Sequence, residues 1–223
     1  MSNDPNAVKK KEFRNMLVSK YSDFLDDKLF LEFGVMNGNS IIDFYDLYKS
    51  KNITGEFFGF DSFLGLPEET EDKYSPWSTG QFTTGGEIHS NILSKSDINI
   101  IDGWFSDTLN DSLLPKFGNK KIGIAHIDCD IYTSTIEVLE FIFKNDLLCD
   151  GSILLYDDWG AYRAKDLSED YEYSVAEARA HAEMVEKYNL NFELVHKEEI
   201  NPAYYIMSVF EFREKYSPFE SGE

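Results

Sequence analysis

The chain has 223 residues and a formal net charge of −20 at pH 7, with 42% hydrophobic and 15% aromatic residues. This composition is that of one globular domain with a sizeable core and excludes a disordered chain. The negative charge argues against a nucleic-acid partner, because phosphates need lysine and arginine, and against docking on an anionic membrane. Two cysteines without a spacing pattern and an N-terminus without an apolar signal segment predict a reduced, cytoplasmic protein, and no run is long enough to span a membrane.

Short apolar runs typical of strands alternate with segments of helical periodicity. In chain order we expect a helix at 5–26, a strand at 29–33, a helix at 40–50, a strand at 56–60, a helix at 87–95, strands at 98–101 and 121–128, a helix at 133–145, a strand at 151–158, a helix at 174–189 and strands at 192–197 and 203–211. This alternation predicts an α/β fold with a mostly parallel sheet covered on both faces. The last two strands are close enough to pair as a hairpin, which inserts one strand antiparallel.

Nearly every unusual residue of the chain falls at the carboxyl end of a predicted strand. These residues are Glu32, Gly34, Asp61, Asp102, Gly103, Asp128, Asp130, Asp157 and Asp158. Ligands of such sheets bind outside the carboxyl ends of the strands, near the point where the strand order reverses. We therefore expect the functional site at that edge of the sheet.

The first of these clusters is a glycine loop, "EFGVMNGNS", between a strand and a helix. Gly34 permits a tight turn, and Gly38 lets the backbone approach a ligand without a Cβ in the way. Ser40 and the free N–H groups of the following helix could hold a carboxylate or phosphate. Met36 replaces the middle glycine of dinucleotide enzymes, which favours a smaller nucleoside ligand. The alternative is a turn that serves chain reversal alone.

Two further strand ends have residues suited to a nucleoside. Asp61 is positioned to accept hydrogen bonds from two ribose hydroxyls, or else caps a turn. Trp104 and Phe105 follow the next strand and could pack against a planar base. Their alternative role is as core aromatics.

Four carboxylates lie at or just beyond the carboxyl ends of the strands at 121–128 and 151–158. If these strands are neighbours, Asp128, Asp157 and Asp158 converge and need a cation to offset their repulsion. Oxygen ligands of this kind favour Mg²⁺, Ca²⁺ or Mn²⁺. Asp130 is the candidate general base, with His126 as a packing residue or an alternative base. The simpler interpretation of Asp157 and Asp158 is a polar turn.

Five motifs occur in an order and spacing that match a known family. They are "LEFGVMNGNS", "FGFDSFLGLPE", "GWFSDTL", "HIDCDIYTST" and "LLYDDW", within residues 29–160. With them the chain resembles the class I S-adenosylmethionine-dependent methyltransferases, most closely the TylF/MycF/NovP-type (macrocin O-methyltransferase) family. The resemblance implies a Rossmann-like fold with a seven-stranded sheet, and we expect one such domain over 1–223.

The resemblance also implies a role for each matching residue. The implied cofactor-binding residues are Glu32, Gly34, Met36, Asn37, Gly38, Ser40, Asp61, Ser62, Trp104, Phe105 and Asp128. Asp128, Asp157 and Asp158 would bind Mg²⁺, and the proposed base is Asp130, with His126 as the second candidate. Catechol and caffeoyl-CoA type relatives have a lysine soon after the first metal aspartate. Ile131 follows Asp130 here, which favours the sugar branch.

The expected function is a Mg²⁺-dependent transfer of a methyl group from S-adenosylmethionine to a hydroxyl of a sugar or related polyol. A catechol-like phenol is the alternative acceptor, and a non-catalytic S-adenosylmethionine or metal binder of the same fold is the alternative outside enzymes. We interpret residues 69–90 as a lid and name Tyr162 and Arg163 as candidate acceptor contacts. The apolar N-terminal helix could mediate self-association.

Overall fold

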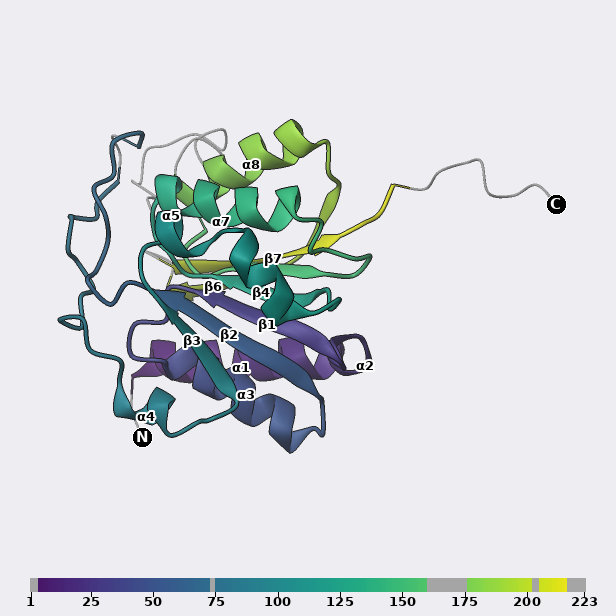
Figure 1. Cartoon of the computed structure of the whole chain (residues 1–223). Coiled ribbons are helices and arrows are strands. Elements are labelled where there is room, and N and C mark those ends of the chain that lie inside the picture. Colours follow the sequence, from purple (N-terminus) through teal and green to yellow (C-terminus); the bar gives the residue numbers. More distant parts are fainter. Residues whose placement is uncertain (1–3, 73–74, 160–175, 202–204, 216–223) are drawn as a thin grey trace.

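The computed structural model describes residues 4–72, 75–159, 176–201 and 205–215. Its strands are β1 (Lys28–Phe33), β2 (Gly55–Asp61), β3 (Ile98–Asp102), β4 (Ile122–Ile127), β5 (Ile153–Tyr156), β6 (Phe192–Asn201) and β7 (Tyr205–Phe212). They form one sheet in the order β3-β2-β1-β4-β5-β7-β6 (Figure 1). The first five strands are parallel, and β7 is antiparallel to both of its neighbours. The predicted α/β fold with one antiparallel strand is confirmed.

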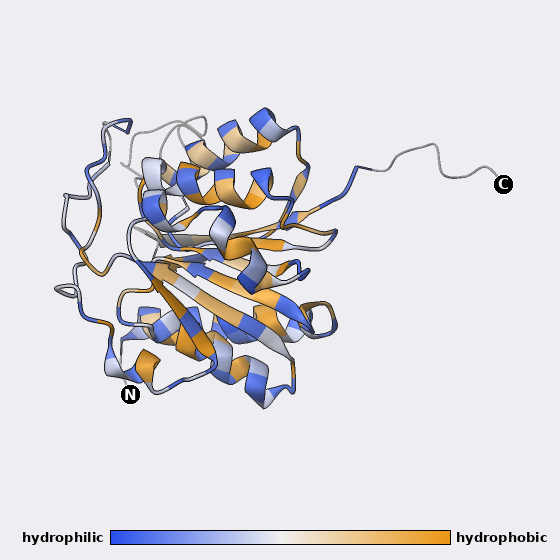
Figure 2. Ribbon diagram, viewed as in Figure 1, coloured by the Kyte–Doolittle hydropathy of each residue, from blue (hydrophilic) through white to orange (hydrophobic). Residues whose placement is uncertain are grey.

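Helices cover both faces of the sheet (Figure 1). One face has α1 (Pro5–Lys20), α2 (Ser22–Leu25), α3 (Asn39–Ser50) and α4 (Ser90–Leu93). The other has α5 (Phe105–Thr108), the 3-10 helix η1 (Asp111–Leu113), α6 (Leu114–Phe117), α7 (Tyr132–Lys144) and α8 (Ala176–Tyr188). Each layer encloses its own apolar core, and Figure 2 shows the hydrophobic residues concentrated on the strands and the helix faces toward them. Within the described residues, no helix has the length and apolar character needed to cross a membrane.

Helix α1 shows how the sequence sets the position of an element. Asp4 caps its first turn by accepting a hydrogen bond from the Asn6 N–H at 3.0 Å, and Pro5 begins the helix. Phe13, Leu17 and Val18 share one stripe and are buried in the core. The helix is thereby fixed along the sheet beside α3.

Two predicted helices differ in the structure. The continuous helix expected over 5–26 is interrupted at Tyr21, whose backbone leaves the helical region (φ −108°, ψ 14°) and whose hydroxyl donates to Glu211 at 3.0 Å. The helix expected over 87–95 is shortened to α4, which begins after the capping residue His89. The short helices α5, η1 and α6 between β3 and β4 were not predicted.

The strand order reverses between β1 and β4, and the loops that leave these strands are joined there. The Gly34 N–H donates to the Phe60 carbonyl of β2, and the Asp128 N–H donates to the Phe33 carbonyl of β1, both at 2.9 Å. Parallel strands end at the same edge, so the first glycine loop and the acidic segments come together at this switch point.

Candidate active site

A cavity of about 480 Å³ opens at this edge of the sheet. Most of the predicted site residues line it, namely Gly34, Met36, Asp61, Ser62, Trp104, Phe105, Asp128, Asp130, Asp157 and Asp158. Its other walls include residues 65–68, Phe82 and residues of α7. The structure therefore brings the glycine loop and the carboxylates to one space.

Each loop glycine is required by a close approach. Gly34 has a φ of +93°, and a Cβ there would lie 1.8 Å from the Asp128 carbonyl oxygen. Gly38 has a φ of +76°, and its Cβ would lie 2.2 Å from the side chain of Ile92 on α4. Gly34 thus fixes the loop against β4, whereas the close approach at Gly38 is to a packed helix and not to the cavity.

Four of the predicted cofactor residues are not among those that line the cavity: Glu32, Asn37, Gly38 and Ser40. Glu32 is fully buried and accepts a hydrogen bond from the Ser40 hydroxyl at 2.8 Å. Its other oxygen lies 3.0 Å from Nδ1 of His126. Glu32 therefore holds the start of α3 and His126 from behind the loop.

Asp61 has the turn-capping role that was one of its two predicted roles. Its Oδ2 accepts hydrogen bonds from the N–H groups of Val35 (2.8 Å) and Met36 (2.7 Å), and its Oδ1 accepts from the Phe63 N–H at 2.6 Å. The same side chain lines the cavity. It shapes the glycine loop while facing the space where a ribose would bind.

The predicted base-binding aromatics lie between the cavity and the core. Trp104 immediately precedes α5, and Phe105 packs edge-on against Phe33, with ring centroids 6.0 Å apart. Both residues line the cavity and are partly exposed. An apolar wall on this side suits a planar base.

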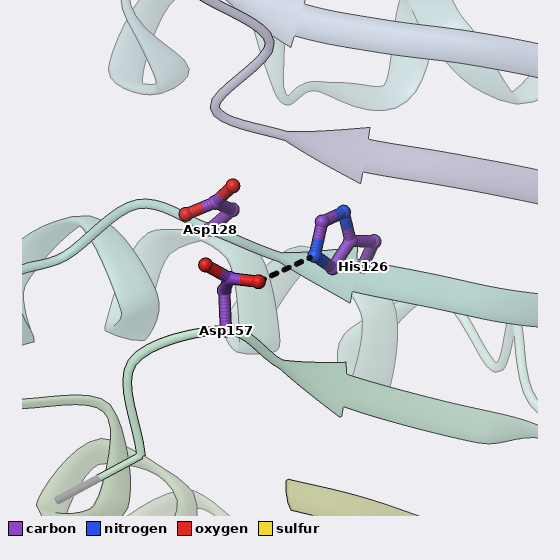
Figure 3. A group of neighbouring side chains, drawn as sticks. All are labelled: His126, Asp128 and Asp157. Atoms are coloured by element: carbon purple, nitrogen blue, oxygen red, sulfur yellow. Dashed lines mark ion pairs between the residues drawn. The ribbon is translucent and has the colours of Figure 1, made fainter. Parts of the chain in front are cut away.

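Figure 3 shows the acidic centre, where Asp128 follows β4 and Asp157 follows β5 beside His126. One candidate ligand atom from each residue lies within 4.8 Å of the others. Oδ1 of Asp157 lies 3.6 Å from Nε2 of His126, an ion-pair distance. Burial lowers the pKa of His126, but Asp157 and Glu32 raise it by more, to about 10. Since His126 is fully buried and does not line the cavity, the structure favours its packing role.

Asp158 and Asp130 form a second pair. Their carboxyls share a hydrogen bond, and Asp130 lies in the left-handed region with a φ of +63°. Burial and the neighbouring carboxylates raise the pKa of Asp128, Asp130 and Asp158 well above the usual range. Within the described ranges, the group of close metal-ligand atoms comprises His126, Asp128 and Asp157, without the predicted third ligand Asp158.

Two residues that the sequence did not predict complete the cluster. Lys10 of α1 lines the cavity and forms an ion pair with Asp157, whose pKa is held well below its usual range by Lys10 and His126 despite burial. Glu177 of α8 is fully buried and accepts a hydrogen bond from the Asp158 N–H at 3.3 Å. Burial, Asp158 and Asp128 raise the pKa of Glu177 well above its usual range.

A sequence signal for one of these residues exists. Glu177 precedes His181 and Met184 by four and seven residues, the spacing of a buried helix face, and all three are buried. Lys10 stands in the run "KKKEF", which is typical of a solvated surface. Its spacing from Phe13 and Leu17 places it on the apolar stripe of the helix, but nothing in the sequence shows that this part of the stripe meets the carboxylates.

The cluster fits a hard divalent cation. Within the described part of the chain, six buried or partly buried carboxyls surround two cationic groups, Lys10 and His126; they are Glu32, Asp128, Asp130, Asp157, Asp158 and Glu177. Among the residues that the structure describes, Asp158 Oδ1 and Glu177 Oε1 are buried and have no hydrogen-bond partner. Carboxylate oxygens are the ligands that Mg²⁺, Mn²⁺ and Ca²⁺ prefer, and an added positive charge would offset this repulsion.

The predicted lid is anchored at two points. The Leu66 N–H donates to the Gln81 carbonyl at 2.9 Å, which closes the loop on itself. The Glu69 carboxylate accepts from the Thr133 N–H at 2.9 Å, at the start of α7. Phe82 and residues 65–68 line the cavity. Tyr74, Tyr162 and Arg163 lie outside the described residues.

Comparison with known proteins identifies relatives of this arrangement. Residues 22–176 match the sequence model of the family described as macrocin-O-methyltransferase (TylF). No curated protein sequence matches significantly.

Among solved structures, the O-methyltransferase NovP is 17% identical with a TM-score of 0.68, covering 93% of this chain and 81% of NovP. CalS11, a TDP-rhamnose 3′-O-methyltransferase of calicheamicin biosynthesis, is 18% identical with a TM-score of 0.59, covering 92% and 79%. An O-methyltransferase from Bacillus cereus in complex with SAH is 15% identical with a TM-score of 0.54, covering 92% and 80%. These structures share the fold of this chain.

Proposed function

The chain belongs to the macrocin O-methyltransferase (TylF) family and is an S-adenosylmethionine-dependent O-methyltransferase, and on that premise we propose its acceptor and its metal. The acceptor is a hydroxyl of a sugar or related polyol in a small molecule, and the transfer depends on Mg²⁺. One observation carries this proposal. Gly34 and Asp61 of the predicted cofactor site line the same cavity as Asp128, Asp130 and Asp157. A methyl donor and a hydroxyl activated at the cluster would therefore meet inside it.

The choice of a sugar rests on the family and on one structural relative. CalS11 acts on TDP-rhamnose, which supports a sugar hydroxyl as the acceptor. The sequence argument from the missing lysine after Asp130 has lost its force, because α1 brings Lys10 to the same cluster. The acceptor screen described below therefore includes phenols.

The residues that would hold S-adenosylmethionine are those lining the cavity beside the glycine loop. We assign this role to Gly34, Met36, Asp61, Ser62, Trp104, Phe105 and Asp128. Glu32, Asn37, Gly38 and Ser40 would act by holding the loop in shape. When bound, the cofactor supplies a methyl group on a positively charged sulfur.

We assign the metal to Asp128, Asp157 and Asp158, with His126 orienting Asp157. A divalent cation there would supply positive charge that lowers the pKa of an acceptor hydroxyl. The Asp130 carboxylate accepts the proton of that hydroxyl, which leaves its oxygen as the nucleophile. Closure of residues 69–90 over the cavity would exclude water from the reacting groups.

We further propose that residues 69–90 close over the bound ligands within a single domain spanning 1–223. Phe82 lines the cavity from this loop, and Glu69 ties the loop to α7. Phe82→Ala should raise the KM for acceptor or cofactor, whereas Leu64→Ala, an exposed side chain that does not line the cavity, should not. Equal KM values for both variants and the wild type would remove the lid role.

Cofactor binding is tested first. S-adenosylhomocysteine and S-adenosylmethionine should each raise the melting temperature of the protein, because a ligand of the folded state stabilises it. A labelled-methyl screen over glycosides, nucleotide sugars and phenols, each with and without Mg²⁺, then identifies the acceptor. Transfer to phenols alone would replace the sugar proposal. If neither ligand changed the melting temperature and no acceptor were methylated, the protein would lack this activity.

Substitutions distinguish the proposed metal ligands from the proposed general base. Asp128→Ala and Asp157→Ala should abolish turnover and its dependence on Mg²⁺. Asp130→Asn should keep cofactor and metal affinity while the rate falls about 100-fold or more. Asp102→Asn, an exposed residue at the end of β3, is the matched control. An unchanged rate in Asp130→Asn would transfer the base role to His126 or another group.

A further inference from the structure

Helix α1 brings one lysine to the acidic cluster. Lys10 precedes Phe13 by three residues and Leu17 by seven, so it lies on the stripe of α1 that faces the molecule. Phe13 and Leu17 are buried, at 4% and 1% exposure, which fixes the helix. The Lys10 side chain is 23% exposed, lines the cavity and ends at Oδ2 of Asp157.

Both oxygens of Asp157 therefore face a positive group. Oδ2 pairs with Lys10, and Oδ1 lies 3.6 Å from Nε2 of His126. The His126 ring is fully buried and held by Glu32 at 3.0 Å. Lys10 is a compact charge on a flexible four-carbon stem. Of the two groups, Lys10 is the one that can move away from Asp157 without repacking the core.

We propose that Lys10 is a tethered cation that pairs with Asp157 in the metal-free protein and leaves it when a divalent cation binds. The two charges compete for one carboxylate, so Lys10 sets the affinity of the site for metal. It also couples the metal site to α1, far from it in sequence. This inference rests on the divalent cation of the proposed function.

The neighbouring lysines provide a matched control. Lys11 lies 3.5 Å from Asp43 with its side chain 67% exposed, and Lys9 lies 3.3 Å from Glu198. Neither lines the cavity. Lys11→Met therefore changes the same charge on the same helix without touching the cluster.

The test is a titration of the cofactor-free protein with MnCl₂, in which the electron paramagnetic resonance signal of unbound Mn²⁺ is measured at each point. Lys10→Met should bind Mn²⁺ at least about tenfold more tightly than wild type, because a competing charge at contact distance is gone. Lys10→Arg, which keeps the charge, and Lys11→Met should stay close to wild type. In EDTA, Lys10→Met should melt below Lys11→Met, since Asp157 loses its partner, and saturating Mn²⁺ should remove that difference.

The outcomes separate this inference from the proposed function. If wild type and Lys10→Met bind Mn²⁺ equally, the competition is refuted and the metal site stands. If Lys10→Met alone binds Mn²⁺, the competition is supported and the metal dependence of the wild-type reaction fails. If neither binds, both are refuted.

A second measurement uses the wild-type protein and so does not depend on a variant that folds. Acetylation of Lys10 by acetic anhydride, followed by peptide mass spectrometry, should increase when MgCl₂ saturates the site, because the ammonium is released from Asp157. Lys9 and Lys11 should react equally with and without Mg²⁺. Unchanged reactivity of Lys10 at saturating Mg²⁺ would overturn the inference.

Discussion

Gly34 shows how one residue joins the glycine loop to the acidic segment. A Cβ there would lie 1.8 Å from the Asp128 carbonyl oxygen, and the φ of +93° is strained for any other residue. Gly34→Ala should therefore lower the free energy of unfolding by about 3 kcal/mol or more, since backbone would have to move. Urea denaturation measures this loss. Gly85→Ala is the control, because Gly85 has a φ of +74° but no atom within 4 Å of its Cβ, and it should cost only about 1 kcal/mol.

His181 provides a pH-dependent prediction. Burial lowers the pKa of His181 to about 3, and its Nδ1 lies 2.9 Å from the Tyr156 hydroxyl. The folded protein keeps this ring neutral, while the unfolded chain takes up a proton below about pH 6.5. The contribution of His181 to the free energy of unfolding is thus fully present above pH 6.5 and is lost as the pH falls toward 3. At pH 5 the loss amounts to about 2 kcal/mol.

Replacing His181 should remove that dependence. His181→Gln keeps a polar group near Tyr156 but cannot take up a proton. The variant should therefore be less stable than wild type at pH 7, and this difference in the free energy of unfolding should shrink by about 2 kcal/mol at pH 5. Urea denaturation of both proteins at the two pH values is the measurement. A deficit that is equal at both would show that His181 is protonated in the folded protein.

At the scale of elements, the loop of residues 69–90, for which we propose a lid role, is attached to α7 through the Glu69 carboxylate. Glu69 accepts hydrogen bonds from the N–H (2.9 Å) and hydroxyl (3.2 Å) of Thr133 at the N-terminal end of α7. Such a cap is worth about 1 kcal/mol, aided by the helix dipole. Glu69→Ala should lose that much stability and expose residues 62–72 to faster proteolysis. Glu71→Ala, an exposed neighbour, should do neither, and identical cleavage rates in the two variants would refute the anchor.

Elements with long periodic patterns could be predicted from the sequence, and those set by distant contacts could not. The seven strands all fall on predicted strand segments, but β6 (Phe192–Asn201) extends past the predicted 192–197 through the charged residues Glu198 and Glu199, and β5 (Ile153–Tyr156) is shorter than the predicted 151–158. The helices α7 and α8 have clear helical spacing. The break at Tyr21 depends on Glu211, which is 190 positions away in the chain. The helix α5 has four residues and forms against Phe33, so no local pattern marks it.

The residues of the site divide in the same way, into those that a local sequence pattern indicates and those that distant contacts bring in. The sequence indicates Asp61, Asp128 and Asp157 because they directly follow strands, and the parallel sheet brings such residues to one edge. The spacing of Lys10 from Phe13 and Leu17 places it on the inner stripe of α1, but the sequence does not show that the packing of α1 brings this stripe to the carboxylates. Glu32 is buried within β1, before the glycine loop, where it pairs with His126 of the neighbouring strand β4.

For the whole molecule, the formal net charge of −20 has a measurable effect on stability. Repulsion among like charges destabilises a compact fold, and salt screens it with a Debye length of about 10 Å at 0.1 M and about 3 Å at 1 M. The melting temperature should rise by several degrees between 20 mM and 500 mM NaCl. Calorimetry in EDTA isolates this effect from metal binding, and a melting temperature that falls with NaCl would show that attractive ion pairs dominate.

The position of β7 constrains the order in which the chain can fold. This strand lies between β5 and β6, although both precede it in sequence. Since the sheet pairs β6 with β7 alone in the described part of the chain, β6 cannot join the sheet until β7 has formed. Until then β5, which precedes the Asp157 and Asp158 segment, is an open edge that can pair with another chain. Shortening the chain before residue 205 should thus yield an aggregating protein, because β5 would remain an exposed edge strand.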